Sequence, residues 1–179
     1  MLYRLRVVIP LIMVFVLSAC ASASAGRGDE VKLSEPTSAK MGMIIGRLDD
    51  AASSDKITYL TIWDAKPRMR HGYMGLPVHL FPDGTFVAEN VEPGKYIVVA
   101  LSSGPHMATV SSEQPLVVEP GKAAYWGAYK VDFKSGSRTF GIPSSVTLTK
   151  AEDQKAKVFA VVLNAAKGTM WERVTRSGM

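Results

Sequence analysis

The sequence predicts a mainly β domain, a sandwich of seven or eight antiparallel strands followed by a C-terminal α-helix. Between residues 41 and 149, short apolar runs of strand length alternate with turns rich in Pro, Gly and Asp, which is the pattern of an all-β sandwich. Over residues 150–179 the pattern changes to that of a helix and tail, which we expect to pack on the sandwich. The 179 residues are enough for one domain with its own core.

Residues 1–19 have the layout of a secretory signal peptide. Arg4 and Arg6 form a short positive region, and a largely apolar run follows from residue 7 to 17. Small residues then lead to Cys20, the only cysteine of the chain. The alternative is a transmembrane helix, but the run is shorter than the roughly 20 apolar residues that a bilayer requires.

The residues Leu17-Ser18-Ala19-Cys20 resemble the lipobox of bacterial lipoproteins. The resemblance implies cleavage just before Cys20 and a diacylglyceryl group on its sulfur. Ala21, in place of an aspartate, implies sorting to the outer membrane. Each buried methylene contributes about 0.8 kcal/mol, so two or three acyl chains hold a protein on a membrane almost permanently. We therefore expect a lipid anchor on Cys20 and a domain on the periplasmic face.

The mature chain is mildly basic. Removing residues 1–19 leaves 160 residues and lowers the formal charge from +5 to +3, because Arg4 and Arg6 are the only charged residues removed. No polybasic run remains, so nucleic acid is not an expected partner. Residues 20–40 are rich in Ala, Ser and Gly, which predicts a flexible tether reaching roughly 22–27 Å on average.

Two strands and a hairpin are predicted next. Residues 43–45 form a strand between two glycines, and residues 57–63 form another with apolar residues on both faces. Residues 78–81 and 85–88 form a hairpin around Pro82-Asp83-Gly84. In this turn Pro presets φ, Asp accepts backbone hydrogen bonds and Gly takes a positive φ.

Four more strands follow, two of them directly after Pro-Gly turns. A turn at residues 92–95 precedes the apolar run 96–101, and Pro120-Gly121 joins residues 116–118 to a long strand at 123–133. A last strand is predicted at about residues 144–148.

Three aromatic residues of the long strand raise the possibility of a carbohydrate-stacking platform. Strict alternation places Tyr125 and Tyr129 on one face, with Val131 and Phe133, and Trp126 on the other. At most one side of the strand is then exposed, which favours packing of these rings in the core.

The C-terminal helix is predicted from Thr149 to Lys167. Thr149 and Glu152 have the spacing of a capping box, and Gly168 suits the position after the helix. Because residues 158–163 are rich in β-branched side chains, a strand is the alternative there. In the tail we expect a short amphipathic turn that packs Trp171 onto the body.

Residues 83–100, DGTFVAENVEPGKYIVVA, resemble the signature of carboxypeptidase regulatory-like, or transthyretin-like (prealbumin-like), β-sandwich domains. The resemblance implies that Gly84 and Gly94 shape turns and that Phe86 and Tyr96 pack between the sheets. It also implies an accessory or binding module. The long aromatic strand and the C-terminal helix are additions to that small domain.

We expect a protein that is not an enzyme and needs no cofactor. The sequence has no nucleophile elbow, phosphate-binding glycine loop or zinc-protease motif. Its three histidines lie in different segments, and no spacing links them to a carboxylate. A hydrolase is therefore the least favoured alternative.

A copper-binding lipoprotein is the second hypothesis. Met69, His71 and Met74 fall within six residues, and His79 follows closely. Thioether and imidazole ligands suit Cu(I). The competing interpretation, which we prefer, is that these are ordinary loop and strand residues in a chain with nine methionines, so that the chain holds no metal.

The loop at residues 64–76 is the predicted contact surface. Arg68, Arg70, His71 and Tyr73 combine cations with an aromatic ring, and Arg and Tyr are frequent anchors of protein interfaces. The alternative is a solvated loop whose charges only keep the protein soluble. We expect the partner to be a protein or glycan of the cell envelope.

Overall fold

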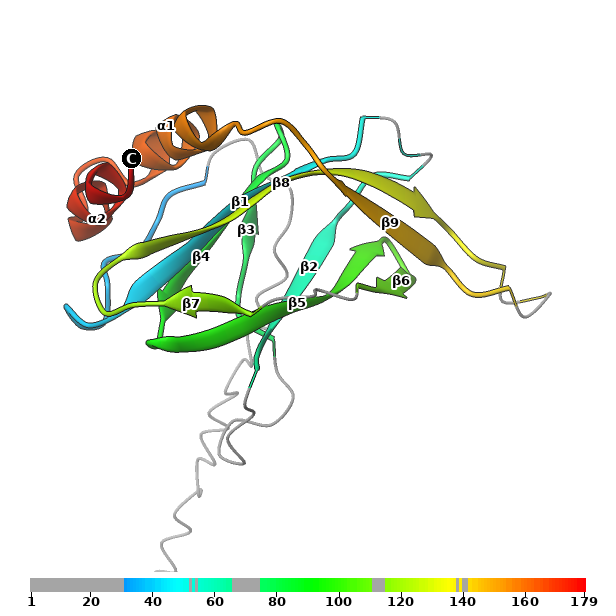
Figure 1. The fold of residues 1–179 in the computed structure, drawn as a ribbon, viewed down its shortest axis with the longest axis horizontal. Coiled ribbons are helices and arrows are strands. Elements are labelled where there is room, and N and C mark those ends of the chain that lie inside the picture. Colours follow the sequence, from blue (N-terminus) through cyan, green and yellow to red (C-terminus); the bar gives the residue numbers. More distant parts are fainter. Residues whose placement is uncertain are drawn as a thin grey trace, which may run out of the picture.

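The computed structural model describes residues 31–51, 53, 55–65, 75–110, 115–137, 139 and 142–179. Within these residues the chain forms nine strands and two helices (Figure 1). In chain order they are β1 (Gly42–Asp49), β2 (Tyr59–Asp64), β3 (His79–Leu80), β4 (Thr85–Val91), β5 (Gly94–Ser103), β6 (His106–Thr109), β7 (Leu116–Val118), β8 (Ala123–Lys134), β9 (Ser145–Lys150), α1 (Lys155–Ala165) and α2 (Met170–Gly178).

The strands form two sheets packed as a sandwich, which confirms the mainly β prediction. One sheet has the order β3-β4-β1-β8-β9, and in the other β5 pairs with β2 on one side and with β6 and β7 on the other. The expectation of seven or eight antiparallel strands and one helix was wrong in its numbers and in one pairing. The described residues form nine strands and two helices, and one pair of strands is parallel. The turn after β7 carries the chain from one sheet to the other, so β8 enters beside β1 and runs parallel to it.

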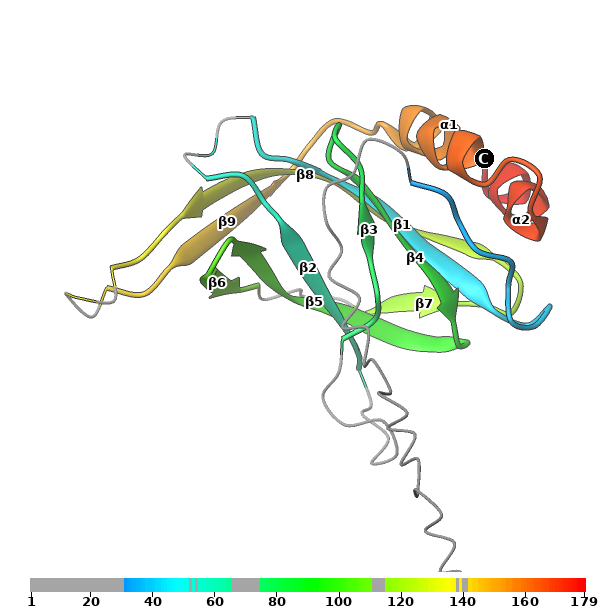
Figure 2. The same ribbon diagram turned by 180° about the vertical axis from the view of Figure 1, so that it is seen from behind.

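The helices add a third layer to the sandwich. They cover the outer face of the five-stranded sheet (Figures 1 and 2), where Val158, Phe159 and Trp171 are fully buried. Packing of the tail through Trp171 is thereby confirmed, although the tail is a helix and not a turn. No helix within the described residues is both long enough and apolar enough to cross a membrane.

The predicted Pro-Asp-Gly turn is confirmed between β3 and β4. The Asp83 carboxylate accepts hydrogen bonds from the backbone N–H and the hydroxyl of Thr85, both at 3.0 Å. Gly84 has a φ of 84°, and a Cβ atom there would lie 2.0 Å from the carbonyl oxygen of Leu48. Glycine is required here for both its conformation and the close approach of the two backbones.

A β-bulge in β8 overturns the predicted placement of its aromatic residues. The pairing with β1 shifts by one residue at Gly127, whose φ is 122°. Trp126 and Tyr129 consequently share the face between the sheets, with ring centroids 4.3 Å apart. Tyr125 lies on the opposite face against Phe159, where burial raises the pKa of its hydroxyl.

The predicted start of the C-terminal helix was also wrong. Thr149 belongs to β9, where it pairs with Lys130 of β8, and α1 begins only at Lys155 without a side-chain cap. The same Thr-x-x-Glu pattern recurs at Thr169 and Glu172, and there it does start a helix. The Thr169 hydroxyl accepts a hydrogen bond from the backbone N–H of Trp171 at 3.2 Å.

Residues 31–40, which we call the strap, were predicted to belong to the tether but pack on the domain. Leu33 is only 5% exposed, and its N–H donates to the carbonyl oxygen of Ala165 at 3.3 Å. The backbone N–H and hydroxyl of Ser34 donate to the Glu89 carboxylate at 3.0 and 2.8 Å. The strap is thus part of the folded domain, and the predicted tether shrinks to residues 20–30, outside the described residues.

Thr169→Ala should lower the free energy of unfolding by about 1 kcal/mol, because it removes the hydroxyl that caps α2. Thr149→Ala is the matched control. Its side chain is exposed at the sheet edge, and the expected change is below about 0.5 kcal/mol. Urea unfolding of the whole chain measures both. Equal losses in the two variants would contradict the assignment of the cap to Thr169.

Candidate binding groove

Most residues singled out from the sequence lie outside the described residues: Cys20, Arg68, Met69, Arg70, His71, Tyr73 and Met74. The two ends of the predicted contact loop are described. Trp63, near the end of β2, is 36% exposed, and the Leu76 N–H donates to the carbonyl oxygen of Ile62 at 2.9 Å. The loop therefore leaves and rejoins the domain at the β2 edge of the four-stranded sheet.

His79 is the one member of the Met/His set that the structure describes. Its Nε2 lies 3.4 Å from a Glu89 carboxylate oxygen, and the same carboxylate accepts the two hydrogen bonds from Ser34. His79 thus contributes to a polar cluster that holds the strap against β4. No group of three His, Cys, Asp or Glu side chains arranged to hold a metal ion occurs within the described part of the chain.

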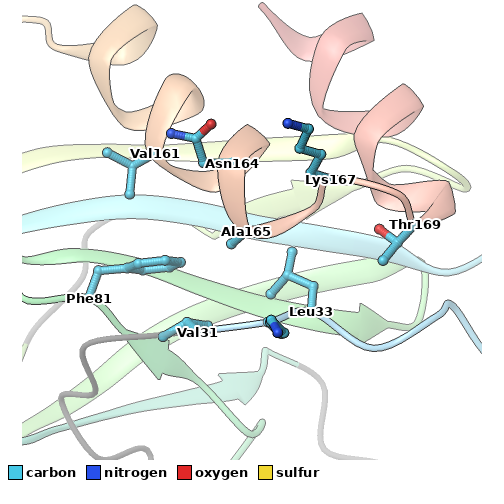
Figure 3. Close-up of a pocket in the computed structure, with 9 residues that line it drawn as sticks. Val31, Leu33, Phe81, Val161, Asn164, Ala165, Lys167 and Thr169 are labelled. Atoms are coloured by element: carbon cyan, nitrogen blue, oxygen red, sulfur yellow. The ribbon is translucent and has the colours of Figure 1, made fainter.

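An open groove of about 550 Å³ lies between helix α1 and the strap (Figure 3). It is lined by Val31, Lys32, Leu33, Phe81, Val161, Asn164, Ala165, Lys167 and Thr169. Three segments far apart in the sequence therefore meet here: the strap, the start of the β3–β4 turn, and the C-terminal half of α1 with the link to α2.

Local structure explains why apolar side chains meet in this groove. Val161 and Ala165 are four residues apart and so lie on the same face of α1. Leu33 is fixed opposite them by its hydrogen bond to Ala165, and Phe81, just beyond β3, forms the floor (Figure 3). The bed of the groove is consequently aliphatic and aromatic.

The polar ends of the lining side chains lie at the rim. Figure 3 shows the amide of Asn164 and the ammonium group of Lys167 directed away from the apolar bed. The only ionisable side chains among the described lining residues are Lys32 and Lys167. Both are exposed, so the rim carries positive charge.

Two described acidic residues close to this rim along the chain, Glu35 and Glu172, already accept hydrogen bonds. Glu35, three residues after Lys32, accepts one from the backbone N–H of Met170 at 3.1 Å. Glu172 accepts hydrogen bonds from Arg176 at 2.9 Å and from the Gly168 N–H at 3.1 Å. These contacts lower the pKa of its carboxyl group, with the Arg176 hydrogen bond as the main cause. The positive charges of Arg176 and of the rim residue Lys167 lower this pKa further.

The groove is suited to binding an apolar ligand with an anionic end. The Thr169 hydroxyl is the one hydroxyl among its described lining residues, and it donates to the carbonyl oxygen of Ala166 at 2.6 Å while capping α2. A nucleophile–base pair is not formed by these lining residues. The lining combines an apolar bed with a few peripheral polar groups, as small-molecule binding sites do.

The groove was not predicted from the sequence, because the composition of residues 31–40 placed them in the predicted tether. The available signal was small: Val31 and Leu33 alternate with polar residues, as in a short extended segment with one buried face. The spacing of Val161 and Ala165 indicates the apolar face of the helix. No pattern in the sequence indicates that this face packs against the strap.

Comparisons of the chain with models of protein families, with curated proteins and with solved structures found no match.

Proposed function

We propose that this chain is a lipoprotein of the bacterial cell envelope, anchored to the outer membrane by acylated Cys20. Its domain is a non-catalytic binding or structural module that faces the periplasm. The observation that carries the proposal is Leu17-Ser18-Ala19-Cys20, placed directly after a positive region and an apolar core. The lone cysteine of the chain stands at the position that lipid attachment requires.

The distance along the chain from anchor to domain supports this proposal. Val31 contacts the groove as part of the folded strap, so eleven residues, 20–30, separate the anchor from the domain. Eleven residues reach at most roughly 36–40 Å when fully extended. The anchor would hold the domain close to the membrane surface.

We further propose that the sandwich is of the transthyretin-like kind. Two positions of the resemblance have the expected structural roles. Phe86 is fully buried between the sheets, and a Cβ at Gly46 would lie 2.5 Å from its ring. The Tyr96 hydroxyl donates to the carbonyl oxygen of Glu92 at 2.8 Å, a contact like the tyrosine corner of other β-sandwiches.

The partner in this proposal is an envelope protein or glycan bound through the loop at residues 64–76. The loop begins next to Trp63, whose partly exposed ring lies on the four-stranded sheet. An aromatic side chain at the base of a loop that contains two arginines and a tyrosine fits the composition of interface anchors.

Cys20→Ala should abolish acylation and cleavage before residue 20, because the sulfur that carries the lipid is removed. Incorporation of labelled palmitate and intact mass measure the change, with Ser24→Ala as the control. Loss of label and accumulation of the uncleaved or soluble chain are expected. Unchanged labelling and membrane fractionation would refute the anchor.

Ala21→Asp should move the protein from the outer to the inner membrane, because aspartate after the lipidated cysteine is the retention signal that the resemblance implies. Separation of the two membranes on a sucrose gradient measures the distribution, and Ala21→Ser is the size-matched control. If both variants stay in the outer membrane, residue 21 does not direct sorting.

Arg68→Ala combined with Arg70→Ala should remove a defined cross-linked partner in intact cells, because it deletes two cationic anchors of the loop. Lys130→Ala with Lys134→Ala is the control, since both lysines are exposed on β8. Affinity capture followed by mass spectrometry gives the readout. Recovery of abundant lipoproteins alone, in equal amounts from all variants, would count against this surface.

A further inference from the structure

We infer that the groove between α1 and the strap binds one acyl chain of an anionic phospholipid, with the headgroup at Lys32 and Lys167. This inference rests on the proposed function, because the envelope address places the domain beside a phospholipid bilayer. It assigns to the groove a ligand distinct from the protein or glycan expected at the loop.

The apolar bed supports an acyl chain as the ligand. Leu33 and Phe81 are almost fully buried, whereas Val31, Val161 and Ala165 remain partly exposed along the groove. A chain of methylene groups would cover this surface and remove it from water, which is favourable in proportion to the apolar area buried. The volume of about 550 Å³ falls within the range of small-molecule sites and does not call for a folded partner.

The rim supports an anionic headgroup. Lysine ammonium groups bind phosphate as point charges, and Lys32 and Lys167 stand on the two sides of the groove, one on the strap and one after α1. The described lining itself contains no carboxylate. The two carboxylates beside it already accept hydrogen bonds, Glu35 from the Met170 N–H and Glu172 from Arg176 and the Gly168 N–H. The charge of the rim is therefore complementary to an anionic lipid.

The position of the groove supports the membrane as the source of this lipid. Val31 lines the groove. It directly follows residues 20–30, the eleven residues that begin with Cys20. Anchoring at Cys20 would thus keep the groove within about 40 Å of the bilayer at full extension. This confinement raises the effective concentration of lipid at the site.

The test uses the full lipidated chain in vesicles of phosphatidylglycerol and phosphatidylethanolamine in equal parts. After gentle detergent extraction, native mass spectrometry separates covalent acyl groups on Cys20 from lipid that dissociates. We expect one phosphatidylglycerol on most wild-type molecules. Ala165→Phe, which fills the groove, should reduce this adduct at least tenfold. Val117→Phe adds the same ring at an exposed position of β7 and should retain the adduct.

A second pair of variants tests the rim without adding bulk. Lys32→Gln with Lys167→Gln should lower the phosphatidylglycerol adduct about fivefold relative to phosphatidylethanolamine, whereas Lys130→Gln with Lys134→Gln should not. Urea unfolding midpoints identify any variant that fails to fold. If Ala165→Phe fails to fold, the result for the double lysine variant decides whether the groove binds the lipid.

The outcomes separate this inference from the proposed function. An acylated Cys20 without a dissociable phospholipid overturns the inference, including the case in which the acyl groups of Cys20 fill the groove. An adduct that is insensitive to both groove variants also overturns it. An unacylated chain whose adduct is lost in those variants retains the lipid site but refutes the anchor.

Discussion

Strand β1 is buried on both of its faces, and the arrangement of the other elements follows from this constraint. Ile44 and Leu48 point into the core between the two sheets, while Met43 and Ile45 point into the core beneath the helices. A strand of this kind needs a neighbour on each edge and a layer on each face. β4 and β8 occupy the edges, the four-stranded sheet covers one face, and the helices with the strap cover the other.

The groove arises where the covering layer is discontinuous. The two helices and the strap are separate segments, and together they cover the core on the outer face of the five-stranded sheet. We call the boundaries between these segments seams. One seam is joined by the hydrogen bond from Leu33 to Ala165, and the groove lies along it. The strap is therefore both a structural cover for β1 and one wall of the candidate site. A change that loosens Leu33 would affect stability and binding together.

The elements that could be predicted from the sequence are those determined by local chemistry. The turn at Gly84 and the strands on either side of it follow from residues close together in the chain. The errors occurred where contacts between distant segments decide the outcome. Pairing with Lys130 keeps Thr149 in a strand although its spacing to Glu152 favours a helix start. The bulge at Gly127 reversed the side-chain alternation of β8, and glycine inside a strand was the one available signal. The groove joins three distant segments, so no local pattern could predict it.

The layer order also relates the anchor to the predicted contact surface. The strap is attached to the helical layer, through Ala165 and through the hydrogen bond from the Met170 N–H to Glu35. The contact loop leaves from β2, which belongs to the four-stranded sheet on the opposite side of the sandwich. That sheet exposes Trp63, Met107 and Val117, which are 36%, 64% and 54% accessible. In the proposed lipoprotein, the chain from Cys20 would therefore join the domain on its helical side, next to the groove. The base of the predicted contact loop lies on the other sheet, so a macromolecule bound there would not compete with the strap for the same surface.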